Sequence, residues 1–455
     1  MGEQIEKGWS RRADQSAAPG GMPAEASESE RIGDVHFSAD NFASALEYYA
    51  RGRRLCERAG ADNLAAARLD LKIADCHRHR GHYRASLQQL ELAKETFRPL
   101  GPSPELGKVY ARQGYCVVNL GRYERGRKFL EIGYQMLRQS SENEEIGNVE
   151  LALGRVFLQT GNRASAREYF ERALATFRRI EHSEGIAHAL NNLAVTLKYA
   201  CQWRDAIEYF GKALRLSERA GTYQRTAHCC LNLGLVHLKT GEWKRAEQYF
   251  ERSLQTYADI GSQSGLAKIR LAQGLLHRRR QEWAASEETL RIALEISTRN
   301  GYAREEALAL EFLGELAHER GESAAAVPLL RDALARAEAL APQGDLMNEV
   351  LRRLADATLA AGDAEAAQGY AQRAEEISLR LDDVLELAAS GRALAQCRHR
   401  LGDRIGAYEK IEESLKLFTL ASERHELGRT HRIGADVDRR PAGVEQRREI
   451  VQVCA

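Results

Sequence analysis

The chain has 455 residues, of which 44% are hydrophobic and 29% are charged, and its formal net charge is +1. That length exceeds what one compact hydrophobic core usually holds, so it predicts either several domains or a solenoid. The nearly neutral charge argues against a nucleic-acid polycation, and no apolar run reaches the ~18–20 residues of a membrane-spanning helix.

The first 25 residues are rich in Ser, Ala, Gly and Pro, and we expect this segment, residues 1–25, to be disordered. A helical pattern begins near Glu25 and continues to His36. From there the chain reads as a succession of amphipathic helices, and its 8 Pro residues leave most of it free to be helical.

A turn position recurs along the chain at a constant step. It is occupied by Asp40, Gly81, Gly121, Gly161, Cys201, Gly241, Gln281, Gly321, Gly362 and Gly402. The step is 40 residues from Gly81 to Gly321, and 41 residues from Asp40 to Gly81 and from Gly321 to Gly362. Glycine there predicts a left-handed helix end, and Cys201 and Gln281 predict slightly strained ones. Ten helix pairs are therefore expected.

Small residues recur on both sides of each turn, at positions such as Gly154, Ala166 and Ala173, and bulky residues such as Phe170 recur beside them. Two antiparallel helices pack closely only where their contact points lack bulk, so this pattern predicts a tight helix hairpin. Trp203, Trp243 and Trp283 fall on one position of three successive repeats, where packing is favoured over a platform for stacking bases.

The last part of the chain departs from the pattern. Residues 423–436 resemble a first helix, Pro441 falls where the turn glycine should be, and residues 444–453 predict a degenerate second helix. We therefore predict a repeat array over residues 26–420 and a degenerate capping helix with a tail over residues 421–455. Pro328 lies within a predicted second helix and should kink it or shorten its start.

These features resemble the tetratricopeptide repeat, most fully in the repeat that contains Gly154, Gly161, Ala166, Phe170 and Ala173. The usual repeat has about 34 residues, so this one resembles the longer form found in polarity scaffolds, kinesin light chains and the sensor arrays of bacterial regulators. The resemblance implies an all-α fold, a right-handed superhelical solenoid of antiparallel helix pairs whose first helices line a concave groove.

Sequence motifs for catalysis are not evident. The chain has no phosphate-binding Gly-rich loop, no His-Glu-x-x-His and no Gly-x-Ser-x-Gly. We therefore expect no enzyme activity, no cofactor and no metal site. Eight cysteines without Cys-x-x-Cys spacing suit a reducing compartment, which predicts a cytoplasmic protein. Glu311, Glu315 and Glu319 recur every four residues and predict an acidic stripe on one helix face.

The predicted groove carries the candidate binding residues. Basic side chains gather at its middle, at Arg155, Lys198, Lys239, Arg278 and Arg279. They favour an acidic peptide segment or a carboxylate. The resemblance implies that Asn192 and Asn232, which occupy one position of adjacent repeats, hydrogen-bond the backbone of a ligand.

Three functions remain open at this point. The first is a scaffold or adaptor that binds a peptide or helix of another protein in the groove. The second is a regulatory sensor array that binds a peptide or effector and signals through a partner, for example in transcription regulation. The third, RNA binding, is disfavoured by the neutral charge.

Overall fold

The computed structural model describes residues 22–438, apart from residues 40, 62, 139, 141, 142, 343, 422 and 423. Within these ranges the fold is all-α, with one short 3-10 helix at Arg98–Leu100 and no strand. The turn at Asp40, the second helix at residues 444–453 and nearly all of the segment predicted to be disordered lie outside the described residues. None of the described helices is long and apolar enough to cross a membrane.

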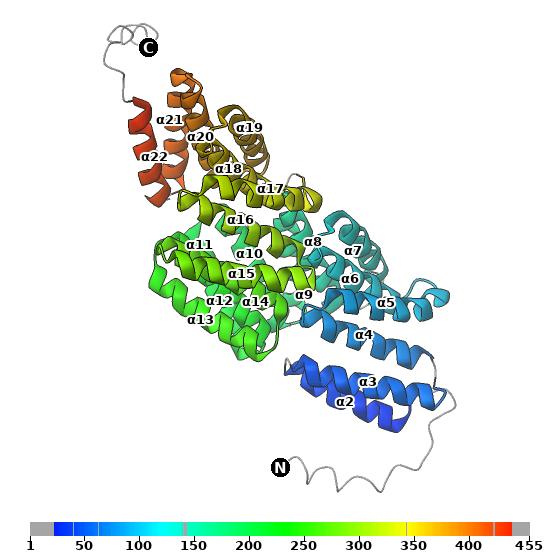
Figure 1. The fold of residues 1–455 in the computed structure, drawn as a ribbon. Coiled ribbons are helices and arrows are strands. Elements are labelled where there is room, and N and C mark those ends of the chain that lie inside the picture. Colours follow the sequence, from blue (N-terminus) through cyan, green and yellow to red (C-terminus); the bar gives the residue numbers. More distant parts are fainter. Residues whose placement is uncertain are drawn as a thin grey trace, which may run out of the picture. The chain divides into compact units, whose positions relative to one another are not determined.

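Helices follow one another in chain order, joined by tight turns (Figure 1). They are α2 (Ala24–Ser38), α3 (Phe42–Arg58), α4 (Asn63–His79), α5 (Tyr83–Phe97), α6 (Pro104–Asn119), α7 (Tyr123–Leu137), α8 (Asn143–Gln159), α9 (Arg163–Arg179), α10 (Ser183–Tyr199), α11 (Trp203–Arg219), α12 (Tyr223–Lys239), α13 (Trp243–Asp259), α14 (Gln263–Arg279), α15 (Trp283–Asn300), α16 (Ala303–Glu319), α17 (Ser323–Leu340), α18 (Asp345–Ala360), α19 (Ala364–Arg380), α20 (Val384–Arg400), α21 (Arg404–Leu420) and α22 (Arg424–Asp438). Ten helix pairs and a final helix therefore occupy the described part, as the sequence predicts.

The chain divides into two compact units. The first unit comprises the described residues up to 197 together with residues 203–306, and the second comprises residues 198–202 and the described residues from 307 onward. Helix α16 begins in the first unit and continues in the second.

From the second pair onward, the turn within each pair has the predicted left-handed residue. Gly81 has φ 82° and Gly241 has φ 82°, and the two predicted exceptions, Cys201 and Gln281, have φ 57° and 62°. At Gln281 the next amide, of Glu282, donates to the carbonyl of His277 over 2.9 Å, while the amide of Gln281 donates to Arg278 over 2.9 Å. This pair of hydrogen bonds satisfies the last carbonyls of the first helix, so the left-handed residue is required whatever its side chain.

The small positions are close-contact points, as predicted. A Cβ atom placed on Gly154 would lie 2.5 Å from Cε1 of Phe170, and one placed on Gly234 would lie 2.4 Å from Cε1 of Phe250. Both phenylalanine rings are fully buried between the helices of a pair. The aromatic ring of the second helix therefore occupies the space that a side chain on the first would need.

Distant repeats meet inside the first unit. The buried Tyr302, in the turn between α15 and α16, donates from Oη to the carbonyl of Gly81 over 2.8 Å, and its ring lies 5.8 Å from that of Tyr83 in an edge-on arrangement. Nearby, Nδ1 of His79 lies 3.0 Å from Oε1 of Gln224 on α12. We call these contacts the clasp. The clasp joins the second repeat to the sixth repeat and to the turn that precedes the eighth.

Pro328 lies inside α17, which nevertheless begins at Ser323. The predicted shortening of the start of this helix is therefore wrong. Proline has no backbone N–H, so the helix loses one hydrogen bond at Pro328. The packing of Ala326 and Leu330, both fully buried, stabilises the first turns of the helix.

Candidate binding face

The first helices of the first unit direct polar and charged side chains toward one another. We call this set the interior face; it consists of Asp75, Arg78, Arg112, Tyr115, Arg155, His188, Arg225, His228 and Lys268. Its members recur at the repeat step: Tyr115 and Arg155 are 40 residues apart, and so are His188, His228 and Lys268 in turn. Equal register places equivalent side chains side by side on successive first helices, which is how the array assembles this face.

Arg155 on α8 is held by neutral groups. Its Nη1 donates to Oη of Tyr115 over 3.0 Å and its Nη2 donates to Oδ1 of Asn119 over 3.2 Å. The guanidinium of Arg78 lies 5.0 Å from the centre of the Tyr115 ring. Burial alone would raise the pKa of Tyr115, but Arg155, Arg78 and Lys268 lower it to about 8.

The other cations of the interior face have carboxylate partners. Arg112 bridges Asp75, over 2.8 Å, and Glu145, over 3.0 Å, while Arg78 contacts Asp75 over 3.0 Å. Although burial opposes ionisation of Asp75, the two guanidinium groups lower its pKa to about 2. Two further pairs complete the set: Arg225 with Glu184 over 2.6 Å, and Lys268 with Glu305 over 3.7 Å. Arg155 is thus the cation of the face that lacks a carboxylate among the described residues.

Two histidines lie among these cations. Burial lowers the pKa of His188 and of His228 well below the usual value, and nearby positive charges lower both further. Four cations act on the two rings: Arg78, Arg155, Arg225 and Lys268. Both imidazoles are therefore neutral at pH 7, in a region of positive potential.

Asparagine amides cross between α10 and α12. Nδ2 of Asn232 donates to Oδ1 of Asn191 over 3.0 Å. Asn192 is 7% exposed, and its Nδ2 has no hydrogen-bond partner within the described part of the chain. A buried amide donor without a partner costs roughly 1–3 kcal/mol, so it marks a position where a further acceptor would be stabilising.

The other predicted site residues are dispersed. Lys239 is exposed at the end of α12, Arg278 is 6% exposed on α14, and Arg279 beside it is half-buried. Lys198 belongs to the second unit, where its ammonium lies 4.9 Å from the centre of the Tyr199 ring. The structure thus places Arg155, Asn192 and Asn232 on neighbouring first helices, α8, α10 and α12.

Sequence reasoning missed His188, His228, Lys268 and Arg225. The signal was present, because the first three occupy one register position, six residues before the small residues Ala194, Gly234 and Gly274. His188, His228 and Lys268 lie in the early turns of their helices, whereas the predicted cations Lys198, Lys239, Arg278 and Arg279 lie in the last turns of the same helices.

The second unit presents a different interior. Arg353 on α18 contacts Glu311 and, over 2.6 Å, Glu315 on α16. Glu311 is fully buried and Glu315 is 9% exposed, so the predicted acidic stripe is wrong for these two residues. The reason is that Arg353, in the next repeat, neutralises the charges of both carboxylates. Arg352 likewise contacts Glu386 over 2.8 Å, and Arg392 contacts Glu426 over 2.6 Å.

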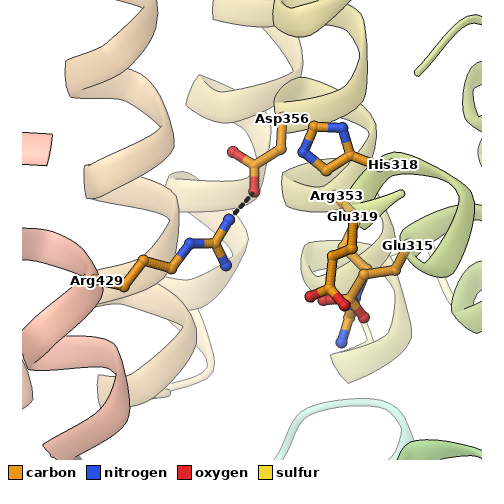
Figure 2. A pocket seen from close by; sticks show the side chains of 6 residues that line it. All are labelled: Glu315, His318, Glu319, Arg353, Asp356 and Arg429. Atoms are coloured by element: carbon orange, nitrogen blue, oxygen red, sulfur yellow. Dashed lines mark hydrogen bonds and ion pairs between the residues drawn. The ribbon is translucent and has the colours of Figure 1, made fainter. Parts of the chain in front are cut away.

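A small pocket lies within this second unit (Figure 2), lined by Glu315, His318, Glu319, Arg353, Asp356 and Arg429. In Figure 2 the guanidinium of Arg429 points toward Asp356, and the two groups are 3.8 Å apart. The lining of the pocket holds charges of both signs. The interior face of the first unit instead holds Arg155, which has no carboxylate partner among the described residues, and the unpartnered Nδ2 of Asn192, and these two groups make that face the better candidate site.

Comparison with known proteins agrees with the helix-pair architecture. Two tetratricopeptide repeat models match the chain, one at residues 185–259 and one at residues 151–197. Among curated proteins, none matches the sequence.

Two solved structures share the fold over most of the chain. A Rap protein complexed with competence and sporulation factor is 12% identical, with a TM-score of 0.51 over 82% of this chain and 97% of that one. The Rap conjugation gene regulator of plasmid pLS20, in complex with the Phr* peptide, is 14% identical, with a TM-score of 0.52 over 83% of this chain and 97% of that one. The chain therefore contains tetratricopeptide repeats over residues 151–259, within a longer array of helix pairs.

Proposed function

We propose that this protein is a peptide-binding scaffold or regulator and that the interior face of the first unit binds its partner. The observation that carries the proposal is the pair of unsatisfied groups there: the Arg155 guanidinium, held only by neutral partners, and the buried Nδ2 of Asn192. A carboxylate would pair with the first and a peptide carbonyl with the second. The partner is therefore a peptide segment, extended or helical, that carries an acidic group.

The similar structures add support of a general kind. One is in complex with competence and sporulation factor and the other with the Phr* peptide, and the array here has the same fold. We carry over only the binding of a peptide by such an array, and no contact residue.

Selection from a displayed peptide library tests this proposal. Wild-type protein should enrich peptides with acidic residues, and Asn192→Ala with Asn232→Ala should weaken their binding. Two lost hydrogen bonds at roughly 0.5–1.5 kcal/mol each predict a loss of about 5- to 150-fold. If the protein captures only nucleic acid, and nuclease abolishes that capture, the proposal is wrong.

A regulatory sensor is the second candidate, and the clasp is the observation that favours it. The hydrogen bond between Tyr302 and Gly81 joins residues 221 positions apart, so a ligand that bound the interior face could change whether the clasp is closed. Small-angle scattering with and without a selected peptide should then show a change in radius of gyration. Identical scattering curves at saturating peptide would leave only the scaffold.

A further inference from the structure

The two half-buried histidines of the interior face have a chemistry that peptide binding alone does not require. His188 on α10 and His228 on α12 form no hydrogen bond or ion pair with any other described residue. His228 has one ring contact, edge-on to Tyr257 at 5.9 Å. Both imidazoles are half-buried, so each has room for a new partner.

Four first helices contribute a cation that acts on one or both rings. Helix α4 contributes Arg78, α8 contributes Arg155, α12 contributes Arg225, and α14 contributes Lys268. The carboxylates of this face are already engaged: Asp75 with Arg78 and Arg112, Glu184 with Arg225, Glu145 with Arg112, and Glu305 with Lys268. These five cations and four carboxylates leave one positive charge, on Arg155, without a counter-charge.

Asn192 supplies the independent indication of a ligand. It lies four residues after His188, one turn further along the same side of α10, and its buried Nδ2 has no partner among the described residues. A guanidinium, an unpaired amide and two imidazoles therefore belong to three adjacent first helices, which together can surround one negatively charged group.

We propose that the interior face is an anion site in which His188 and His228 take up protons as a carboxylate or another oxyanion binds beside Arg155. The anion supplies the missing counter-charge. It also offsets the positive charges that disfavour protonation of both rings, because an adjacent negative charge favours the imidazolium. Each protonated ring then donates a hydrogen bond to the anion. This inference rests on the proposed function only for the source of the anion, a peptide carboxylate rather than a free ion.

Histidine NMR in the full-length chain tests the site. The probe is sodium sulfate, compared with sodium chloride at equal ionic strength, and the ring signals of the 13 histidines are assigned with His188→Gln and His228→Gln. Sulfate should raise the pKa of both rings by roughly one unit or more, a tenfold gain in proton affinity. No difference between sulfate and chloride at either ring would overturn the proposal.

Two arginine variants show whether Arg155 is responsible. Arg155→Gln should abolish the response to sulfate and Arg155→Lys should restore part of it. Arg167→Gln, at a 66% exposed side chain on α9, is the matched control and should respond like wild type. An undiminished response in folded Arg155→Gln would contradict the site as assigned.

Hexaglutamate and hexaglutamine distinguish the two sources. If hexaglutamate shifts both rings and hexaglutamine does not, the bound group is a peptide carboxylate. A response to sulfate without one to hexaglutamate supports the site with a small free anion as its ligand. If a library-selected peptide contacts the interior face and no anion shifts the histidines, proton uptake is refuted while the proposed function stands.

Discussion

The clasp of the first unit yields a prediction with a calculable size. Tyr302→Phe removes only the hydroxyl group that donates to the Gly81 carbonyl over 2.8 Å. Tyr302 is 0% exposed and Gly81 is also buried, so the carbonyl would keep no partner and the loss should be roughly 1–3 kcal/mol. At 1.4 kcal/mol per factor of ten, opening of the clasp becomes about 5- to 150-fold more frequent.

Hydrogen exchange detects this opening locally, which matters because a repeat array need not unfold in one step. Amides of residues 79–83 and 301–304 should exchange faster in Tyr302→Phe by that factor. Tyr408→Phe, at a 48% exposed side chain of α21, is the control and should leave them unchanged. Equal exchange in Tyr302→Phe and wild type would refute a clasp that stabilises the closed arrangement.

Three further predictions concern packing, turns and pH. Gly234→Ala places a Cβ 2.4 Å from Phe250 and should lower the free energy of unfolding in urea by about 1–3 kcal/mol. Gly211→Ala, whose Cβ would meet only Arg215 at 3.6 Å, should raise it by about 0.5–1 kcal/mol. A reversed order of the two variants would contradict the assigned packing. Gln281→Gly relieves the backbone strain of a non-glycine residue at φ 62° and should raise the melting temperature. Gly241→Ala introduces such strain at φ 82° and should lower it. A lower melting temperature in Gln281→Gly would contradict strain at this turn. Burial and Arg78 lower the pKa of His79 to about 3, so the unfolded chain binds more protons below pH 6.5 and the folded state loses stability as pH falls. Between pH 6.5 and 5 this loss should be smaller in His79→Gln by about 1–2 kcal/mol. An unchanged pH dependence in that variant would contradict the buried, neutral state of His79.

The fold was predictable because its determinants are local and repeated. Gly154 and Phe170 belong to one helix pair, and the same relation returns in Gly234 and Phe250 at a spacing that the sequence keeps. Left-handed turns at Cys201 and Gln281 followed from position alone, since the neighbouring repeats have glycine there. Two further left-handed residues, Glu181 and Asp382, lie between pairs. Glu181 occupies the position that Gly221, Gly261 and Gly301 hold at the 40-residue step, so this turn also had a sequence signal.

The candidate site was only partly predictable, because its contacts join different repeats. Their positions in the repeat indicated Arg155, Asn192 and Asn232 as candidates. Whether a charged side chain is neutralised, however, depends on a partner about one repeat away in the sequence. Glu311 was predicted to belong to an acidic stripe from the spacing within its own helix, and its partner Arg353 follows 42 residues later. The clasp has no sequence signal at all, since Gly81 and Tyr302 meet only after several repeats have curved round.

The central claim is that the interior face of the first unit binds a peptide. Calorimetry with one library-selected acidic peptide tests it most directly, on wild type, Arg155→Gln and the exposed control Arg167→Gln. Loss of a charge-assisted pair predicts about 1.5–3 kcal/mol, a roughly 10- to 150-fold weaker dissociation constant, for Arg155→Gln and none for Arg167→Gln. Equal affinity of all three proteins, each shown to be folded, would contradict the claim.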